Sequence, residues 1–114
     1  YYPLPGDNLR IKFLLKIDEL TNLRSYFNAR LVNTSGGSII LLNREIASNT
    51  FPNFTLFEFS TSIPDSISVD VFNNLRYEWR LTFVSSTDYS KAKIYIDKFE
   101  IYAYRNNNCV LLPN

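Results

Sequence analysis

Apolar and polar residues alternate along most of the chain, which is the pattern of β-strands that bury one face. In residues 9–17, LRIKFLLKI, every second residue is apolar, and Leu14 departs from the pattern. Residues 26–33 and 75–83 alternate in the same way, and helical periodicity is nearly absent. Further strands are predicted for residues 38–42, 54–61, 67–71 and 93–104, with turn signals at 33–37 and 64–65.

This order of elements predicts an all-β chain of about seven or eight strands joined by short turns. Strands that hide one face and expose the other are typical of antiparallel sheets, so the predicted fold is an antiparallel β-sandwich. A length of 114 residues suits one domain. We place that domain at residues 8–105, with an N-terminal arm or linker at 1–7 and a C-terminal tail at 106–114.

The alternation also predicts which aromatic side chains belong to the core. The single tryptophan, Trp79, shares its face of the strand with apolar residues, namely Leu75, Tyr77, Leu81 and Phe83. Because this face is apolar throughout, we expect Trp79 to be part of the core and not a binding surface. In residues 54–61 two alternatives stay open, because either Phe54 and Leu56 or Phe57 and Phe59 must face inward.

The amino-acid composition excludes several kinds of catalytic and metal-binding site. The chain has no histidine and one cysteine, so Ser-His or Cys-His pairs, imidazole metal sites and thiolate zinc sites are excluded within it. Carboxylate pairs can hydrolyse glycosides, and the candidates here are Glu58, Asp70, Glu78, Asp97 and Glu100. No pair of them carries a recognisable motif. We therefore expect a binding protein and not an enzyme.

Charge and hydropathy narrow the range of partners. The formal net charge is +1 at pH 7, which gives no general attraction to nucleic acid. No apolar run approaches the roughly 18 residues that a membrane-spanning helix needs. We expect neither nucleic acid nor membrane as a partner. The start, YYPLPGDN, has no methionine, which indicates a mature product or a domain of a longer protein.

Three segments, taken in order, resemble the galactose-binding-like jelly-roll of carbohydrate-binding modules. They are LRIKFLLKI, then FTLFEFSTSIPDSISV with NLRYEWRLTFVS, and finally KIYIDKFEIYAY. The resemblance implies a non-catalytic, extracellular module that binds a polysaccharide. Such a module would belong to a glycoside hydrolase or to a phage tail or baseplate that adheres to its host. The alternative is a structural domain that assembles with other proteins in a larger complex such as a virion tail.

Asp97 interrupts the alternation of the last predicted strand. Ile94 and Ile96 share one face, but the next large apolar residues are Phe99 and Ile101. A step of three where two is expected predicts a β-bulge at Asp97-Lys98. The carboxylate could accept backbone N–H groups that the bulge leaves unpaired. The family resemblance adds another interpretation, a structural Ca²⁺ held in part by Asp97, and both stay open.

The polar faces of three predicted strands supply the candidate binding residues. They are Arg10, Lys12, Tyr26, Asn28, Arg30, Arg76, Glu78 and Arg80. If these strands share a sheet, they form one basic surface, and arginine forks would suit an anionic or phosphate-bearing cell-wall glycan. The competing interpretation is a solvated face with cross-strand ion pairs, such as Glu78 with an arginine. A second possible location is a rim of loop tyrosines, namely Tyr1, Tyr2, Tyr89, Tyr102 and Tyr104.

Overall fold

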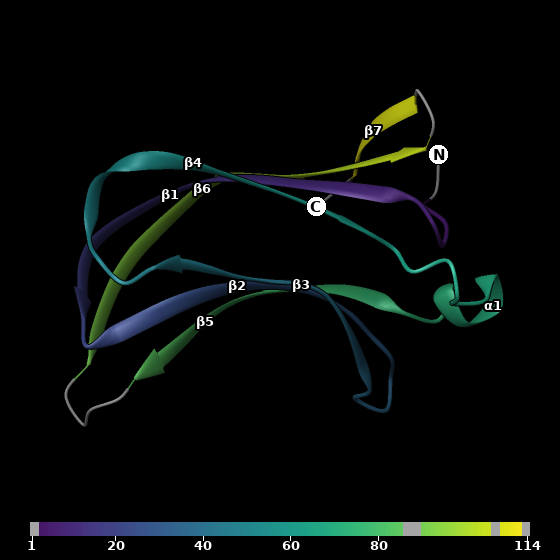
Figure 1. Cartoon of the computed structure of the whole chain (residues 1–114), viewed down its shortest axis with the longest axis horizontal. Helices are drawn as coiled ribbons and strands as arrows, with labels where there is room; N and C mark the ends of the chain where they lie inside the picture. Colours follow the sequence, from purple (N-terminus) through teal and green to yellow (C-terminus); the bar gives the residue numbers. More distant parts are fainter. Residues whose placement is uncertain (1–2, 86–89, 106–107, 113–114) are drawn as a thin grey trace.

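The computed structural model describes residues 3–85, 90–105 and 108–112, which form an antiparallel β-sandwich (Figure 1). The first sheet has the strand order β4 (Phe51–Ser62), β1 (Asn8–Thr21), β6 (Lys91–Arg105) and β7 (Asn108–Leu112). The second sheet has the order β3 (Ser38–Ala47), β2 (Leu23–Val32) and β5 (Arg76–Ser85). The predicted fold class, an all-β antiparallel sandwich, is confirmed.

Two segments differ from their predicted structure. Residues 67–71 form no strand, because Ser68 caps a short helix, α1 (Val69–Phe72), by accepting a hydrogen bond from the Val71 N–H. Buried Phe72 fixes this helix against the core. The expected tail at 106–114 is also wrong in part, because Asn108–Leu112 form β7 and pair with β6. Because Asn108 is polar, the sequence pattern does not indicate a strand that begins at this residue.

A cluster of phenylalanine rings joins the two sheets. The ring centroid of Phe13 on β1 lies 5.1 Å from that of Phe27 on β2, in the opposite sheet. Within the first sheet, Phe13 lies 5.8 Å from Phe57 and 5.7 Å from Phe99. These rings come from four strands, β1, β2, β4 and β6. Trp79 on β5 packs against the same core with its centroid 6.1 Å from Phe99, so the expectation that it is a core residue is confirmed.

The segment before β1 is tied into the sandwich. Asp7 is 2% exposed, and its carboxylate accepts hydrogen bonds from Arg105 at 2.6 and 2.8 Å. It also accepts the Leu4 N–H at 2.8 Å, while Gly6 at φ 92° donates its N–H to the Ile63 carbonyl. The residues at the end of the expected arm, 1–7, therefore hold the start of β1 to the end of β6.

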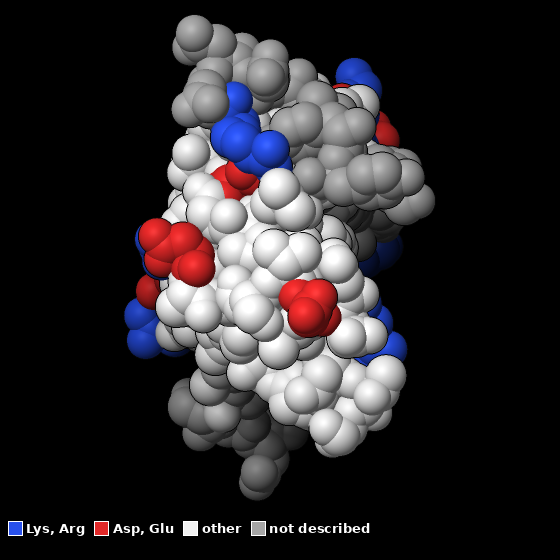
Figure 2. All heavy atoms as spheres, turned by 90° about the vertical axis from the view of Figure 1, so that its right-hand side faces the viewer, with Lys and Arg blue, Asp and Glu red and all other residues white. Residues whose placement is uncertain are grey.

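The end of the molecule that carries α1 is largely uncharged. Figure 2 shows a mostly white surface there, with some acidic groups and with lysine or arginine at its margins. Val69 and Val71 of α1 are 50% and 54% exposed.

Phe13→Ala should unfold the domain more easily, because it removes the ring that contacts both sheets. We expect a loss of about 3 to 5 kcal/mol in the free energy of unfolding, measured by urea denaturation. Phe54→Ala is the control, since Phe54 is 46% exposed and should cost less than about 1 kcal/mol. Equal losses for the two variants would contradict the assignment of Phe13 to the centre of the core.

Asp7→Ala should lower the free energy of unfolding by about 2 to 3 kcal/mol, because it removes a buried acceptor of charged hydrogen bonds. The control is Glu58→Ala, which breaks an ion pair with Arg10 whose side chains are 49% and 42% exposed. An exposed pair contributes about 0 to 1 kcal/mol. If Asp7→Ala proved as mild as Glu58→Ala, the segment before β1 would not be held as described.

Candidate functional site

The structure divides the predicted binding residues between the two sheets. Arg10 and Lys12 lie on β1, in the first sheet. The other six lie on β2 and β5, in the second sheet, and they are Tyr26, Asn28, Arg30, Arg76, Glu78 and Arg80. The expectation of one shared surface is therefore wrong. We call the outer sides of the two sheets the first-sheet face and the second-sheet face.

Aromatic side chains gather on the first-sheet face. Phe57 and Phe59 pack in the core, which settles the phase of β4 and leaves Phe54 and Leu56 outside, 46% and 55% exposed. Leu9, Ile11, Ile101 and Ala103 are buried, so the residues between them on β1 and β6 face outward. The aromatic residues of this face are Phe54, Tyr95, Tyr102 and Tyr104.

One part of the first-sheet face is an aromatic pair around a lysine. The Lys16 ammonium lies 4.6 Å from the ring centroid of Tyr95 and 5.6 Å from that of Phe54. These are cation–π distances. The Tyr95 residue is 39% exposed, so both rings retain surface that solvent reaches. The Lys16 ammonium thus lies near two aromatic rings contributed by the strands on either side of β1.

A second part of the same face combines tyrosines with charged hydrogen-bonding groups. The Arg10 guanidinium lies 5.8 Å from the Tyr104 ring centroid, and its Nε lies 3.3 Å from a Glu58 oxygen. The Tyr102 hydroxyl donates to Glu100 at 3.3 Å. Lys12 pairs in register with Glu58 on one side and Glu100 on the other. Planar donors and acceptors thus lie beside half-buried tyrosines.

The formal charges of the first-sheet face nearly balance among the described residues. Its basic side chains include Arg10, Lys12, Lys16, Lys91 and Lys93, and its acidic ones include Asp18, Glu19, Glu58, Asp97 and Glu100. Surfaces of mixed sign exert little long-range attraction on an anion. This face therefore carries little net charge.

The second-sheet face is basic, and several of its side chains bind one another. The Arg24 guanidinium donates to both oxygens of Glu45, at 3.0 and 3.1 Å. These hydrogen bonds and the negative charge of Glu45 raise the pKa of Arg24 above its usual value. The Asn28 amide, 8% exposed, donates to Asn43 on β3. Part of the second-sheet face is thus a network of salt bridges and hydrogen bonds.

Glu78 was expected to pair with an arginine across strands. Its ion pair is instead with Arg80 on the same strand, at 2.6 Å. Residues two apart on a strand share a face, so this pairing is compatible with β5 geometry. The expectation of an ion pair is confirmed and its cross-strand arrangement is wrong.

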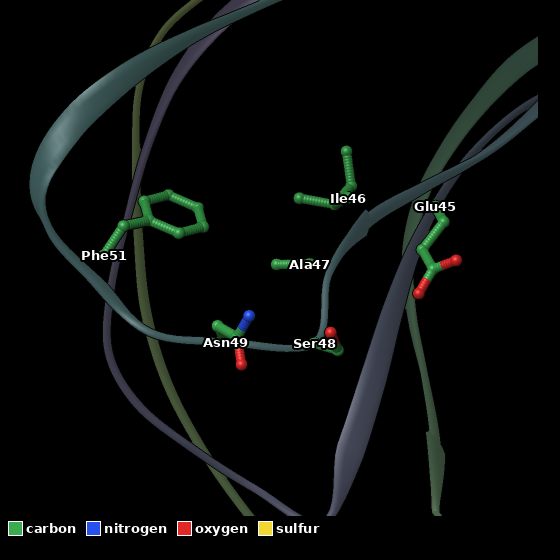
Figure 3. Close-up of a pocket in the computed structure, with 6 residues that line it drawn as sticks. All are labelled: Glu45, Ile46, Ala47, Ser48, Asn49 and Phe51. Carbon is green, nitrogen blue, oxygen red and sulfur yellow. The ribbon is translucent and has the colours of Figure 1, made fainter.

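The opposite end of the sandwich from α1 contains open hollows between the turns. One, of about 460 Å³, is bordered by Glu45–Asn49 and Phe51 (Figure 3). The Phe51 ring points across it toward Ile46, whereas Glu45 lies on the other side of β3. A neighbouring hollow of about 510 Å³ includes Arg24 and shares Ser48. Arg24 and Glu45 bind each other. The hollows therefore have fewer charged groups available for other contacts than the two outer sheet faces have.

Asp97 lies at a β-bulge, as the sequence predicts. Two residues of β6, Lys98 and Phe99, lie opposite the single residue Phe13 of β1, and Lys98 has φ 51°. The Asp97 carboxylate accepts the Lys98 N–H at 2.8 Å. Within the described residues, no group of three His, Cys, Asp or Glu side chains could hold a metal ion. Backbone bonding is therefore observed, and the Ca²⁺ interpretation stays a prediction.

Two of the five tyrosines predicted to form a loop rim lie in a strand. Tyr102 and Tyr104 lie within β6 and belong to the first-sheet face. Tyr1, Tyr2 and Tyr89 lie outside the described residues. Sequence reasoning missed Phe54 and Tyr95 as site residues, and the phase of β4 and β6 was the signal that could have identified them.

Comparison with known proteins finds no family model, no curated protein and no solved structure that matches the chain. In the part of the chain that the structure describes, no helix is long and apolar enough to cross a membrane. The function must therefore be argued from the two faces themselves.

Asp97→Ala should lower the free energy of unfolding by about 1 kcal/mol, because the Lys98 N–H loses its acceptor. The melting temperature of the unaltered protein should not change when EDTA or Ca²⁺ is added. Differential scanning calorimetry measures both effects. A Ca²⁺-dependent rise in melting temperature that disappears in Asp97→Ala would contradict a role limited to the backbone and would support the calcium interpretation.

Proposed function

We propose that this chain is a non-catalytic glycan-binding module and that the first-sheet face is its binding surface. The observation that carries the proposal is the combination of exposed aromatic rings with planar hydrogen-bonding groups on one face. Tyr95 and Phe54 lie at one part of it, and Tyr104 with Arg10 lies at another. Sugars expose apolar C–H faces beside hydroxyl groups, so a sugar-binding surface needs both kinds of contact.

The positions of the rings suit an extended ligand. Tyr95 and Tyr104 lie near opposite ends of β6, with the bulge between them. At about 3.3 Å per strand residue, their Cα atoms are separated by roughly 25 Å. A polysaccharide lying along β6 could contact both aromatic groups, whereas a single sugar could contact one. Multiple weak contacts along one chain add to a useful affinity.

Lys16 would adapt to the ligand. Its ammonium covers parts of the Tyr95 and Phe54 rings, but the lysine side chain is long and flexible. A sugar that stacks on either ring would displace the ammonium toward a hydroxyl group. The charge balance of the face favours a neutral polysaccharide, while the anionic glycan expected from the sequence depended on the arginines of the second-sheet face.

The backbone of the first sheet is curved. The strands β1, β4 and β6 bend toward the second sheet at one end, which makes their outer side convex (Figure 1). A convex face suits a polymer displayed on a surface more than a single chain enclosed in a cleft. This is compatible with an extracellular module of a glycoside hydrolase or of a phage tail or baseplate, and that context is part of the proposal.

One observation favours the alternative, an assembly domain. An apolar opening of about 90 Å³ lies between the sheets, bordered by Trp79 and Leu81 of β5 and by Ile96 and Phe99 of β6. In the described residues, β5 pairs with β2 alone, and β7 covers β6 at Ile101–Arg105. Unpaired strand edges beside an apolar opening can accept a strand from another protein.

Tyr95→Ala should weaken glycan binding about tenfold, since a well-placed aromatic contact contributes more than about 1 kcal/mol. The measurement is affinity electrophoresis in gels with soluble xylan, glucan or bacterial cell-wall polysaccharide, and sedimentation with cellulose or chitin. Tyr26→Ala is the matched control, because Tyr26 lies on the opposite face. Both variants should unfold at the same temperature as the unaltered protein.

Two results would contradict the proposal. If none of these glycans retarded the unaltered protein, the chain would not be a glycan-binding module of this kind. If Tyr26→Ala weakened binding and Tyr95→Ala did not, the ligand would lie on the second-sheet face. A defined complex with another protein, lost when Ile96 is changed to Lys at the apolar opening, would favour the assembly domain.

A further inference from the structure

The second-sheet face carries positive charge that its own acidic groups do not neutralise. Its arginines are Arg24, Arg30, Arg76 and Arg80, and its acidic residues are Glu45 and Glu78. Glu45 is bound by Arg24 through two hydrogen bonds, and Glu78 by Arg80. Among the described residues, this leaves Arg30 and Arg76 without an ion pair. The surplus charge therefore lies at one place on the face.

The register of β2 and β5 brings these arginines together. Arg30 lies directly opposite Glu78, and Val32 lies opposite Arg76. Arg76 and Arg80 are thus the two diagonal neighbours of Arg30, at Cα distances of roughly 7 to 8 Å, within reach of long side chains. Three arginines are consequently register neighbours of one another around Glu78, whose carboxylate forms an ion pair with Arg80.

This cluster contains buried polar atoms with no aligned hydrogen-bond partner. The Nε of Arg30 is one, and an oxygen of Glu78 is another, because its 2.6 Å contact with Arg80 lacks hydrogen-bond alignment. Buried donors and acceptors in folded proteins are nearly always paired. The Arg30 Nε is a donor, so an acceptor such as an oxyanion oxygen would pair it, whereas the Glu78 oxygen is an acceptor and needs a donor.

We propose that Arg30, Arg76 and Arg80 form a binding site for an oxyanion, that is, for a carboxylate, phosphate or sulfate group of a ligand. Arginine forks bind such groups through two parallel hydrogen bonds. Arg76 is exposed and supplies the first fork at the surface, and half-buried Arg30 supplies the second from beside it. Arg80 balances Glu78, which would otherwise repel the incoming anion.

This site lies on the opposite outer face from the proposed glycan surface and does not depend on it. The two faces differ in chemistry, since the first is aromatic with balanced charge and the second is rich in arginine. The oxyanion site would give the domain a second, charge-dependent contact. Loss of binding to neutral glycans would leave it intact.

The test uses polymers that differ in their charged groups. Dextran and dextran sulfate share a backbone and differ in sulfate, while polygalacturonate supplies carboxylate and polyphosphate supplies phosphate. Binding is measured by isothermal titration at physiological salt. We expect at least one polyanion to bind and neutral dextran not to bind at this site, with affinity that falls as salt rises.

Three variants separate a fork-shaped site from general positive charge. Arg76→Ala should weaken polyanion binding about tenfold, and Arg76→Lys, which keeps the charge and loses the fork, should weaken it several-fold. Arg44→Ala is the matched control and should change affinity less than about twofold. Arg44 is also exposed and on the second sheet, but its guanidinium donates to the neighbouring Asn43 carbonyl.

Each other outcome would overturn the proposal. Failure to bind any of the three polyanions would show that the cluster has no oxyanion ligand of these classes. An equal effect of Arg44→Ala and Arg76→Ala would show diffuse attraction to the whole surface. Full affinity in Arg76→Lys would show that charge alone is recognised. Tyr95→Ala should leave polyanion binding unchanged, which separates this site from the glycan surface.

Discussion

The contact of the Phe13 ring with rings from both sheets is the constraint on which the rest of the structure depends. Phe13 meets Phe27 across the sandwich and Phe57, Phe59 and Phe99 within its own sheet. Once these residues face inward, strand geometry forces their sequence neighbours outward. Lys12 and Leu14, on either side of Phe13, therefore face solvent. The chemistry of the outer faces follows from the packing of the core.

The bulge at Lys98 extends this constraint along β6. On a regular strand, residues at odd and even numbers face opposite sides, so Tyr95 and Tyr102 would lie on different faces. The extra residue shifts the phase, and both tyrosines come to lie outside while Phe99 enters the aromatic core. Asp97 stabilises the shift by accepting the Lys98 N–H. The Asp97 carboxylate, in the middle of an apolar strand, thereby helps β6 to place Phe99 in the core and both tyrosines on the surface.

Local patterns predicted the strands and their inward faces well, because burial imposes a period of two wherever one side of a strand is covered. The bulge could also be predicted, since a break in that period has few other causes. Residues 67–71 were misassigned because Ser68 and Asp70 alternate with apolar residues as in a strand, although they also cap and begin a helix. The β7 strand was missed because its pairing with β6 is a tertiary contact that five residues cannot encode.

The candidate site was harder to predict, because it depends on which strands become neighbours. Arg10 and Arg80 have the same pattern in the sequence, yet β1 and β5 enter different sheets and their arginines face opposite directions. The partition gives each sheet its own chemistry. The arginine and lysines of β1 lie between the strands β4 and β6, which supply tyrosine, phenylalanine and glutamate. Their charges are therefore matched, and their side chains lie beside rings. On β2 and β5 the arginines outnumber the acidic residues, and among the described residues Arg30 and Arg76 form no ion pair.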